Sequence, residues 1–594
     1  MKTTVSDYVF SRVAAEGVKD IFMVSGGGIM FLCEALGKNK ELKYWCNYNE
    51  QACAIAAEAY SRTTENIGVC LVTTGPGSTN ALSGVAGAWV DSIPLLVISG
   101  QVRTGVLADY KTQRQVGPQE INIIPMAKPV TKYAITVMDP LSIRYELEKA
   151  LYLAQNGRPG PAWINIPLDI QSSLIETDEL VGYVPSSNLC PSLINTDISK
   201  VIEQLYKATR PVIIGGSGII LAHARKTFQS IVHRTEIPTL LTMSAMDLLD
   251  ENDPLFQGRL GPAGQRRANF ALQNADLVLG LGASLSISSL GFAQGVAPHA
   301  YKILVNIDAG DLDKKNISID HKVLTDVDTF MKKLMAEINT AKIKISHCWK
   351  KTCTMWKEKY PPSLPHQLRQ KCCVDMFSFS EELSQQMDKT DILVGGNSHD
   401  GGLIQFQNHK FKSQQRSLIN FCYGAMGWDL PALVGACVAS PNRRSILTTG
   451  DGSIMFNIHE LLFLGFHKCN AKIFISNNDG YMGIIKTQDR FFKGNYVAAT
   501  KKSGVANPNF KALAKAFGLK YIFLENNEQI REAISKIFSD TEPWICEIKT
   551  SQNQQYFKVG SYQKEDGSLA SRSLEDMTPL LPPEEIEENM NIFN

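Results

Sequence analysis

The sequence predicts an α/β protein with three tandem domains, each built on a doubly wound parallel sheet. Two observations lead to this prediction. Short apolar runs end repeatedly in glycine-rich turns and are followed by amphipathic stretches, which is the order of strand, turn and helix in a parallel sheet. Polar, proline-containing stretches divide the chain at two places, and 594 residues at roughly 150 per domain accommodate three or four domains.

The first unit is predicted over residues 1–180. Helical spacing of apolar residues predicts a helix over 6–15, and high helix propensity predicts another over 50–62. Apolar runs predict strands over 20–24, 68–73, 94–99 and 162–166. Two of these strands run into glycine turns, at 25–28 and 74–80, where a parallel sheet places its ligands.

The second unit, predicted over residues 195–340, repeats this rhythm, and so does the third, over 362–555. Their predicted strands are 211–214, 275–280 and 302–307 in the second unit, and 392–394, 445–449, 471–476 and 544–548 in the third. The polar stretch near 171–197 and the lysine-rich stretch 342–359 are interpreted as linkers. Residues 556–594 are polar and acidic, and we interpret them as a C-terminal tail.

Charge and composition exclude several classes of function. The 60 Lys and Arg residues nearly balance the 59 Asp and Glu residues, which argues against a nucleic-acid-binding protein. No apolar run reaches the ~18 residues of a membrane span, and the first ten residues contain no signal-peptide core. The 13 cysteines include no Cys-x-x-Cys pair, a usage typical of a reducing compartment. We therefore expect a cytoplasmic enzyme that binds neither nucleic acid nor membrane.

Two polar motifs follow neighbouring predicted strands of the third unit. Gly450-Asp451-Gly452 ends one strand, and Asn477-Asn478 ends the next, with 24 residues between the motifs. Asp-Gly and Asn-Asn each form ordinary turns in many proteins. Because both motifs lie at the carboxyl ends of parallel strands, the combination favours a ligand site at that edge of the sheet.

These residue types suit a magnesium ion that is shared with a diphosphate. Mg²⁺ takes oxygen ligands in octahedral geometry, usually one or two protein groups together with phosphate oxygens. Asp451 offers a carboxylate, Asn478 an amide oxygen and Gly480 a backbone carbonyl. Gly452 lets the backbone approach the phosphates closely, and Ser453 can donate a hydrogen bond at a helix N-terminus.

Together the two motifs resemble the cofactor-binding signature of the thiamine-diphosphate (ThDP) enzymes, which is Gly-Asp-Gly, a gap of this size and Asn-Asn. Residues 73–80 and 98–102 resemble the acetolactate synthase-like family, of the large or catalytic subunit type. The resemblance covers nearly the whole chain, from 24–28 through 157–161 to the second motif. It implies a pyrimidine-binding, a central and a diphosphate-binding domain, with ThDP and Mg²⁺ as cofactors.

The resemblance also implies catalytic residues. Glu50 matches the family's glutamate, which hydrogen-bonds to the pyrimidine ring and favours the imino tautomer that takes the proton from C2 of the thiazolium. Met426 matches a methionine that wedges beneath the cofactor, and Gly424 a glycine whose carbonyl accepts from its amino group. Taken alone, Glu50 could complement a helix dipole and Met426 could fill a core gap, but the surrounding motifs favour the catalytic roles.

The same resemblance adds further contacts to the cofactor and the substrate. The remaining residues expected to contact the cofactor are Gly26, Thr74, Gly75, Asn80, Gly396, Asn397, Ser398 and Tyr481. Gln119 matches a substrate-side glutamine, although a plain surface-loop role stays open. Whether FAD is bound also stays open. The residues that would contact it are Arg158, Gly215, Gly216, Ser217 and Gly282, yet Ser284 and Leu285 stand where the family places arginines.

Several residues narrow the reaction. The first histidine is His223, so the first unit lacks the histidine pair of pyruvate decarboxylase-type enzymes. Glyoxylate carboligases lack the catalytic glutamate, whereas Glu50 is present here. The resemblance therefore favours a carboligase that decarboxylates a 2-oxo acid, with pyruvate expected, and transfers the acyl unit to a second carbonyl acceptor. Leu168 and Thr487 replace a lysine and an acceptor-selecting tryptophan of the acetolactate synthases. The alternatives are a related decarboxylase or lyase, and a two-carbon branching enzyme that acts on a sugar ketone.

The sequence also disfavours two other functions and, through the resemblance, implies an oligomer. A dinucleotide-dependent dehydrogenase is disfavoured because no Gly-x-Gly-x-x-Gly opens a helix. A catalytically silent homologue is disfavoured because Glu50 and Asp451 are both present. The family implies a homodimer or homotetramer, since these two residues serve one cofactor from two different subunits.

Overall fold

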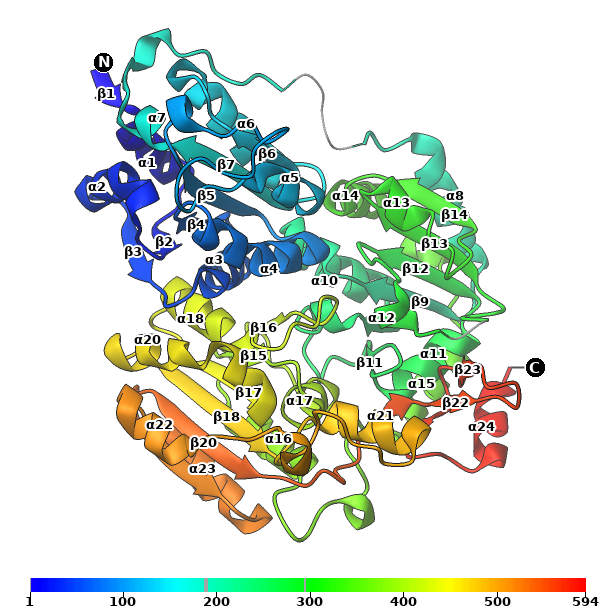
Figure 1. Cartoon of the computed structure of the whole chain (residues 1–594). Coiled ribbons are helices and arrows are strands. Elements are labelled where there is room, and N and C mark those ends of the chain that lie inside the picture. The colour runs from blue at the N-terminus through cyan, green and yellow to red at the C-terminus, as the bar shows by residue number, and fades with distance from the viewer. Residues whose placement is uncertain (1, 186–190, 293–294, 594) are drawn as a thin grey trace.

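Three six-stranded sheets, parallel throughout, form the framework of the chain, as the sequence predicts (Figure 1). The computed structural model describes residues 2–185, 191–292 and 295–593. None of the helices in these ranges is long and apolar enough to cross a membrane. The sheets follow one another along the chain as the N-terminal, the central and the C-terminal sheet.

The N-terminal sheet has the strand order β3-β2-β4-β5-β7-β6. Its strands are β2 (Asp20–Met23), β3 (Lys43–Cys46), β4 (Gly68–Val72), β5 (Leu95–Gln101), β6 (Tyr133–Thr136) and β7 (Pro161–Pro167). The helices of this unit are α1 (Val5–Ala15), α2 (Met30–Lys38), α3 (Glu50–Thr64), α4 (Pro76–Asp91), α5 (Ile123–Ala127), α6 (Ile143–Gln155) and α7 (Leu168–Ser172). Every residue of β4 and β5 is buried, because the central strands of a parallel sheet are covered on both faces.

The central sheet has the order β11-β10-β9-β12-β13-β14. Its strands are β9 (Pro211–Gly215), β10 (Thr239–Leu241), β11 (Phe256–Arg259), β12 (Leu277–Leu281), β13 (Tyr301–Asn306) and β14 (His321–Leu324). Its helices are α8 (Asn195–Lys207), α9 (Gly218–Leu221), α10 (Arg225–Thr235), α11 (Arg266–Asn274), α12 (Ile287–Leu290), α13 (Ala309–Leu312) and α14 (Val327–Glu337).

The C-terminal sheet has the order β16-β15-β17-β18-β20-β19. Its strands are β15 (Ile392–Gly395), β16 (Arg416–Ile419), β17 (Ser445–Gly450), β18 (Ala471–Asn477), β19 (Lys520–Leu524) and β20 (Trp544–Lys549). Its helices are α16 (Met376–Gln386), α17 (Ile404–Asn408), α18 (Asp429–Ala439), α19 (Asp451–Ile454), α20 (Leu461–Phe466), α21 (Met482–Phe492), α22 (Phe510–Phe517) and α23 (Ile530–Ile537). Gly450 lies opposite Ser476 in the β17–β18 register, so the residues that follow these strands meet at one edge.

Helices α3 and α18 pack against each other and join the N-terminal to the C-terminal unit (Figure 1). Small residues allow this approach, because a Cβ atom on Gly435 would overlap the carbonyl oxygen of Ala56. The buried carboxylate of Glu58 accepts a hydrogen bond from the Trp428 indole at 2.6 Å and forms an ion pair with Arg62 at 2.5 Å. The contact therefore combines close backbone packing with a paired buried charge.

Both stretches interpreted as linkers contain ordered elements, so these interpretations were wrong in part. The lysine-rich stretch forms α15 (His347–Lys359), which buries Trp349, Cys353 and Trp356 at helical spacing. The polar stretch near 171–197 contains β8 (Leu174–Glu176), which pairs with β1 (Lys2–Thr4), and the start of α8. Residues 186–190 lie outside the described residues. Abundant lysines concealed the apolar face of α15, which is narrow but continuous.

The C-terminal tail folds back onto the central unit, as Figure 1 shows at the red end of the chain. It contains β21 (Lys558–Val559), β22 (Ser561–Gln563), β23 (Leu569–Ser571), β24 (Met577–Thr578) and α24 (Pro583–Met590). Asn269 donates a hydrogen bond to the carbonyl of Leu574 at 2.9 Å, and the Trp356 indole donates to Asn589 at 2.6 Å. These buried bonds attach the tail to α11 and α15.

Candidate active site

A buried carboxylate stands at the edge of the C-terminal sheet where β17 ends. Asp451 is the first residue of α19 and is 2 % exposed. It accepts hydrogen bonds from the backbone N–H of Gly452 at 2.8 Å and of Gly480 at 3.3 Å, and from the side-chain amide of Asn507 at 2.7 Å. The three donors come from segments that follow β17 and β18, so they hold the carboxylate at the junction of the two predicted motifs.

A second buried carboxylate, Asp400, orients Asn478. Asp400 accepts from the amide of Asn478 at 2.8 Å, from the Thr550 hydroxyl at 3.0 Å and from the Ser476 hydroxyl at 2.8 Å. Because the amide nitrogen of Asn478 is engaged in this way, its Oδ1 is turned away from Asp400. That oxygen is buried and has no hydrogen-bond partner. A buried acceptor without a partner is costly, and a cation would satisfy it.

The electrostatics of this corner also fit a cation. Burial, together with the nearby charge of Asp400, raises the pKa of Asp451 to about 7. A divalent cation would offset the cost of burial and the repulsion from Asp400, because its charge stabilises the ionised carboxylate. Carboxylate and amide oxygens are the ligands that Mg²⁺ prefers. The structure thus brings together Asp451, Asn478 and Gly480, the three predicted magnesium ligands.

Glycines allow the walls of this site to pack closely. A Cβ atom on Gly452 would overlap the Tyr481 ring and would lie 3.4 Å from the terminal methyl carbon of Met426. A Cβ atom on Gly396 would lie 2.5 Å from carboxylate oxygen Oδ2 of Asp429. Both positions therefore need glycine, and the predicted residues Tyr481 and Met426 lie against Gly452.

Three other predicted residues already bond to the protein. The Asn397 amide donates to the carbonyl of Gly424, which has a positive φ of 66°. The Ser398 hydroxyl donates to Asp400 at 2.8 Å, and the buried Ser453 hydroxyl accepts from the Gly427 N–H at 3.2 Å. The two serines therefore stabilise the loops around the site, which adds a structural role to the predicted cofactor contacts.

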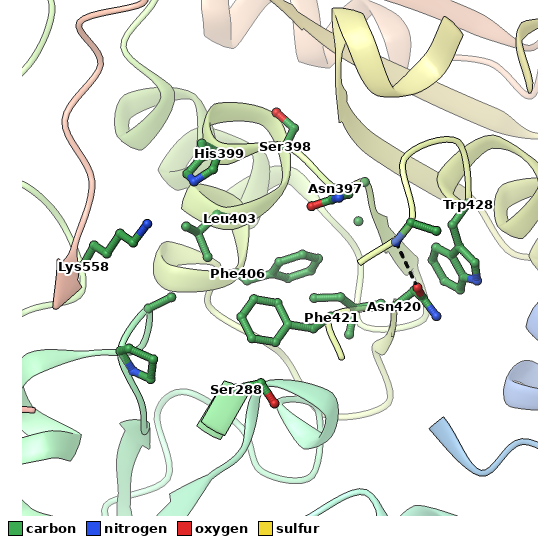
Figure 2. Close-up of a pocket in the computed structure, with 16 residues that line it drawn as sticks. Ser288, Asn397, Ser398, His399, Leu403, Phe406, Asn420, Phe421, Trp428 and Lys558 are labelled. Atoms are coloured by element: carbon green, nitrogen blue, oxygen red, sulfur yellow. Dashed lines mark hydrogen bonds between the residues drawn. The ribbon is translucent and has the colours of Figure 1, made fainter. Parts of the chain in front are cut away.

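A cavity of about 350 Å³ opens beside these loops (Figure 2). Gly396, Asn397 and Ser398 form part of its wall. Other lining residues come from α17, from the segment after β16, from the central unit and from the C-terminal tail, and they include Phe406, Phe421, Trp428, Pro262, Ser288 and Lys558. The cavity is thus mostly apolar, with polar groups at its edges, as is usual for a small-molecule site.

Glu50 opens α3 in the N-terminal unit, where Asn49 caps the helix by accepting from the Gln51 N–H. The Glu50 carboxylate accepts a hydrogen bond from the Asn80 amide at 3.0 Å. Thr74 lies on the neighbouring turn, and its buried hydroxyl has no partner. The structure therefore brings Glu50, Thr74 and Asn80 to the region where β4 gives way to α4.

The turns after β2 and β4 fit together through glycines. A Cβ atom on Gly26 would lie 2.5 Å from the Thr73 hydroxyl. Gly75 has a positive φ of 66°, and a Cβ atom there would overlap the carbonyl oxygen of Gln119. Gln119 itself is exposed with a φ of 63°. Its loop is held by Glu120, which accepts from the N–H groups of residues 108 and 116 at 2.6 and 2.7 Å.

The two halves of the predicted site are not joined within one chain. Glu50 does not line the cavity beside Gly396, and the structure gives no hydrogen bond between Glu50 and Asp451 among the described residues. The only partner of the Glu50 carboxylate in the described part of the chain is Asn80. Within the described residues, each half therefore lies in its own unit of the chain.

The residues predicted to contact a flavin lie only partly together. A cavity of about 330 Å³ is lined by Arg158, Ser217 and Gly282. Gly215 is the last residue of β9, and a Cβ atom on Gly216 would overlap the carbonyl of Gly282. These two glycines therefore serve the packing of neighbouring turns, and only the other three predicted residues face the cavity.

Three residues of the site were missed by reasoning from the sequence. Asp400 carried a usable signal, because it follows the predicted strand 392–394 within the turn that contains Gly396. Asn507 and Thr550 carried none, since they reach Asp451 and Asp400 from segments far along the chain. Tertiary folding alone brings them to the site.

Family models of thiamine pyrophosphate enzymes match three parts of the chain. The N-terminal TPP binding domain matches residues 3–126, the central domain 198–334, and the C-terminal TPP binding domain 400–548. These ranges contain the N-terminal half-site, the central sheet and the Asp451 corner respectively.

Curated relatives resemble the chain over nearly its full length. The acetolactate synthase large subunit of Cyanidium caldarium is 29 % identical over 550 residues, covering 90 % of this chain and 92 % of the relative. The acetolactate synthase isozyme 1 large subunit of Escherichia coli (strain K12) is 27 % identical, covering 94 % and 95 %. The acetolactate synthase large subunit of Lactococcus lactis is 29 % identical and covers 93 % of both chains.

Proposed function

Because this chain belongs to the thiamine pyrophosphate enzyme family and is acetolactate synthase-like over most of its length, we propose that it is a magnesium-dependent carboligase that uses ThDP. The donor is a 2-oxo acid, with pyruvate as the first candidate, and the acyl unit that remains after loss of CO₂ passes to a second carbonyl compound. One observation carries the proposal at the site. Asp451 is buried beside an Asn478 oxygen that lacks a partner, at the edge where the two motifs meet.

Each predicted residue has a role in this proposal. Asp451, Asn478 and Gly480 would hold the magnesium ion, and the glycine turns would admit the diphosphate. When bound, ThDP supplies a nucleophilic carbon and stabilises the negative charge left when CO₂ departs. Glu50 would hold a proton against the pyrimidine ring, and Asn80 keeps that carboxylate in place. Met426, packed against Gly452, would orient the ring system.

The active site is proposed to form between two subunits. Exposed aromatic side chains border both half-sites, because Tyr48 is 49 % exposed beside Glu50 and Phe456 is 54 % exposed beyond α19. An association surface between subunits would bury both of these apolar side chains. Light scattering on the purified protein tests this part. A mass of two or four chains is expected, and a monomer that is fully active would contradict it.

The acceptor site is proposed to admit a carbonyl compound larger than a second pyruvate. Thr487 stands on α21 where acetolactate synthases place a tryptophan, and its hydroxyl bonds back to the carbonyl of Gly483 at 2.9 Å. The side chain at this position is therefore much smaller than a tryptophan and is held back against its own helix. This feature favours a sugar ketone as acceptor over a second 2-oxo acid.

A flavin has no part in the proposed mechanism. The Arg158 guanidinium pairs with Asp308 at 3.2 Å and with Asp311 at 3.5 Å. Asp311 also lines the cavity where a flavin would bind, so that cavity carries a carboxylate. These residues fit a diphosphate poorly. Mass spectrometry of ligands released from the purified protein tests this point together with the presence of ThDP.

The decisive experiment measures CO₂ release from pyruvate in the presence of ThDP and Mg²⁺. Release that depends on both cofactors is expected, and no release from pyruvate or any other 2-oxo acid would reject the proposal. Product analysis then separates the alternatives. A carboligase forms a new carbon–carbon bond with an added ketone, whereas a decarboxylase yields only the free aldehyde.

A further inference from the structure

Basic side chains gather around one end of the cavity. Lys558 of the C-terminal tail and His399 both line the cavity, and Figure 2 shows Lys558 at the opposite end from Trp428. Lys486 and Arg490 approach the same place from α21. In the described part of the chain, neither of them nor Lys558 has a carboxylate oxygen within the 4.0 Å of an ion pair.

The contacts of α21 show that these groups face one space. The Nζ of Lys486 lies 5.8 Å from the ring centre of Tyr556, and that ring lies 5.2 Å from the His399 ring. A Cβ atom on Gly560 would lie 3.7 Å from the Arg490 guanidinium. Lys558 lies in the chain between Tyr556 and Gly560, so α21 presents both of its cations to the segment that carries Lys558.

This arrangement is unfavourable unless an anion is present. Lys486 and Arg490 are four residues apart on one helix face, where like charges repel each other. Desolvation lowers the pKa of Lys558, and Arg490 lowers it further. Burial lowers the pKa of Lys486, and the nearby charges of Asp489 and Asp400 oppose this effect only in part. Neither carboxylate forms an ion pair with Lys486, since Asp489 accepts from the Tyr496 hydroxyl at 2.5 Å and Asp400 accepts from the donors described above.

We propose that this cluster of Lys486, Arg490 and Lys558 binds a phosphate group of the acceptor substrate. The inference deepens the proposed function and rests on it. The single carboxylate of a 2-oxo acid needs one cationic partner, whereas a phosphate group carries close to two negative charges and three acceptor oxygens. A phosphorylated ketone, such as a sugar phosphate, would therefore place its anionic end at the cluster and its carbonyl toward the loops around Gly396.

The test compares dihydroxyacetone phosphate with dihydroxyacetone, which present the same ketone with and without the anion. Calorimetry on the enzyme loaded with ThDP and Mg²⁺ should show binding of the phosphorylated ketone that is at least about tenfold tighter, as expected for charge-assisted hydrogen bonds. Lys558→Met and Arg490→Met should each reduce that preference about tenfold. Lys558→Arg should retain it, which separates loss of charge from loss of fold.

Lys511→Met is the matched control, because Lys511 is exposed on α22, a helix that Figure 1 shows well away from α21. Equal binding of the two ketones, or equal effects of Lys558→Met and Lys511→Met, would overturn the inference. Variants of the cluster that weaken the binding of ThDP but not of the phosphorylated ketone would also overturn the inference, because the cluster would then serve the cofactor.

CO₂ release from pyruvate is measured in parallel. If CO₂ is released but the phosphorylated ketone is not preferred, only this inference fails, whereas no release from pyruvate or any other 2-oxo acid rejects the proposed function.

Discussion

Asn478 donates its amide to Asp400 at 2.8 Å and thereby leaves its own carbonyl oxygen buried and unpartnered. The pair explains why an asparagine in a strand-end motif can be a metal ligand. Its nitrogen is held by a carboxylate, and only its oxygen remains for a cation. Asp400 thus acts through Asn478, as the outer partners of metal ligands commonly do.

Replacing the proposed metal ligand should abolish cofactor binding. Asp451→Ala removes the only carboxylate among the three ligands, so ThDP with Mg²⁺ should no longer raise the melting temperature. The wild-type protein should gain about 2–3 kcal/mol of stability when the cofactor is at 100 times its Kd. The exposed Asp313→Ala variant is the control and should keep the full shift. An unchanged shift in Asp451→Ala would remove this residue from the metal site.

Removing the charge of Asp400 should weaken magnesium binding without removing a ligand. Asp400→Asn turns an acceptor into a donor opposite the Asn478 amide and the Thr550 hydroxyl, so Asn478 loses its orientation. We expect the Mg²⁺ concentration for half-maximal activity to rise about 10- to 100-fold. Thr550→Val, which removes one donor only, should have a smaller effect. Equal Mg²⁺ requirements in wild type and Asp400→Asn would contradict the orienting role.

The charge of Glu50 should matter for turnover and little for cofactor affinity. Glu50→Gln keeps the size of the side chain and its bond to Asn80 but removes the proposed proton relay. CO₂ release from pyruvate should fall by about 10²- to 10⁴-fold, as for other lost acid–base groups, while the thermal shift with ThDP persists. Glu41→Gln, at an exposed position, serves as the control. Wild-type turnover in Glu50→Gln would refute the relay.

A buried carboxylate between the N-terminal and C-terminal units should make stability depend on pH. Glu460 accepts from the Asn47 amide and the Tyr48 N–H, both at 2.8 Å, and burial raises its pKa from 4.5 to about 7. Since the folded state binds this proton more tightly than the unfolded state, the contribution is full below about pH 4.5 and is lost as the pH rises through about 7.

Glu460→Gln should therefore flatten the pH dependence of the protein free of cofactor. Relative to the variant, the wild type should lose up to about 3 kcal/mol of unfolding free energy between pH 5 and 7.5. Urea unfolding across this range measures the difference. Parallel curves for the two proteins would show that Glu460 does not titrate as proposed.

Arg259 should be essential for the contact between the central and C-terminal units. It is fully buried, pairs with Glu251 at 3.1 Å, and donates to the carbonyls of Phe406 and His409 at 3.1 and 2.6 Å. Arg259→Met leaves these acceptors unpaired, so the unfolding free energy should drop by about 3–5 kcal/mol. Arg114→Met, on an exposed loop, should lie within about 0.5 kcal/mol of wild type in the same urea titration.

The sequence predicted every inner strand of the three large sheets except β10, and none of their edge strands. Strands β4, β5, β17 and β18 are covered on both faces and therefore read as continuous apolar runs. The unpredicted strands β3, β6, β11, β14, β16 and β19 all lie at sheet edges, and β10 lies next to one. An edge strand such as β3 is only four residues long and mostly exposed, so it lacks that signal.

The sequence by itself determined the features that are local. A glycine turn after a buried strand marks a place where the backbone turns tightly or approaches another segment closely. Asp451 and Asn478 could be assigned to one edge because neighbouring parallel strands place their carboxyl ends together. Only the tertiary structure decided what surrounds them. Asn507, Thr550 and Lys558 come from segments whose approach depends on packing between distant elements, and no periodicity of the chain encodes it.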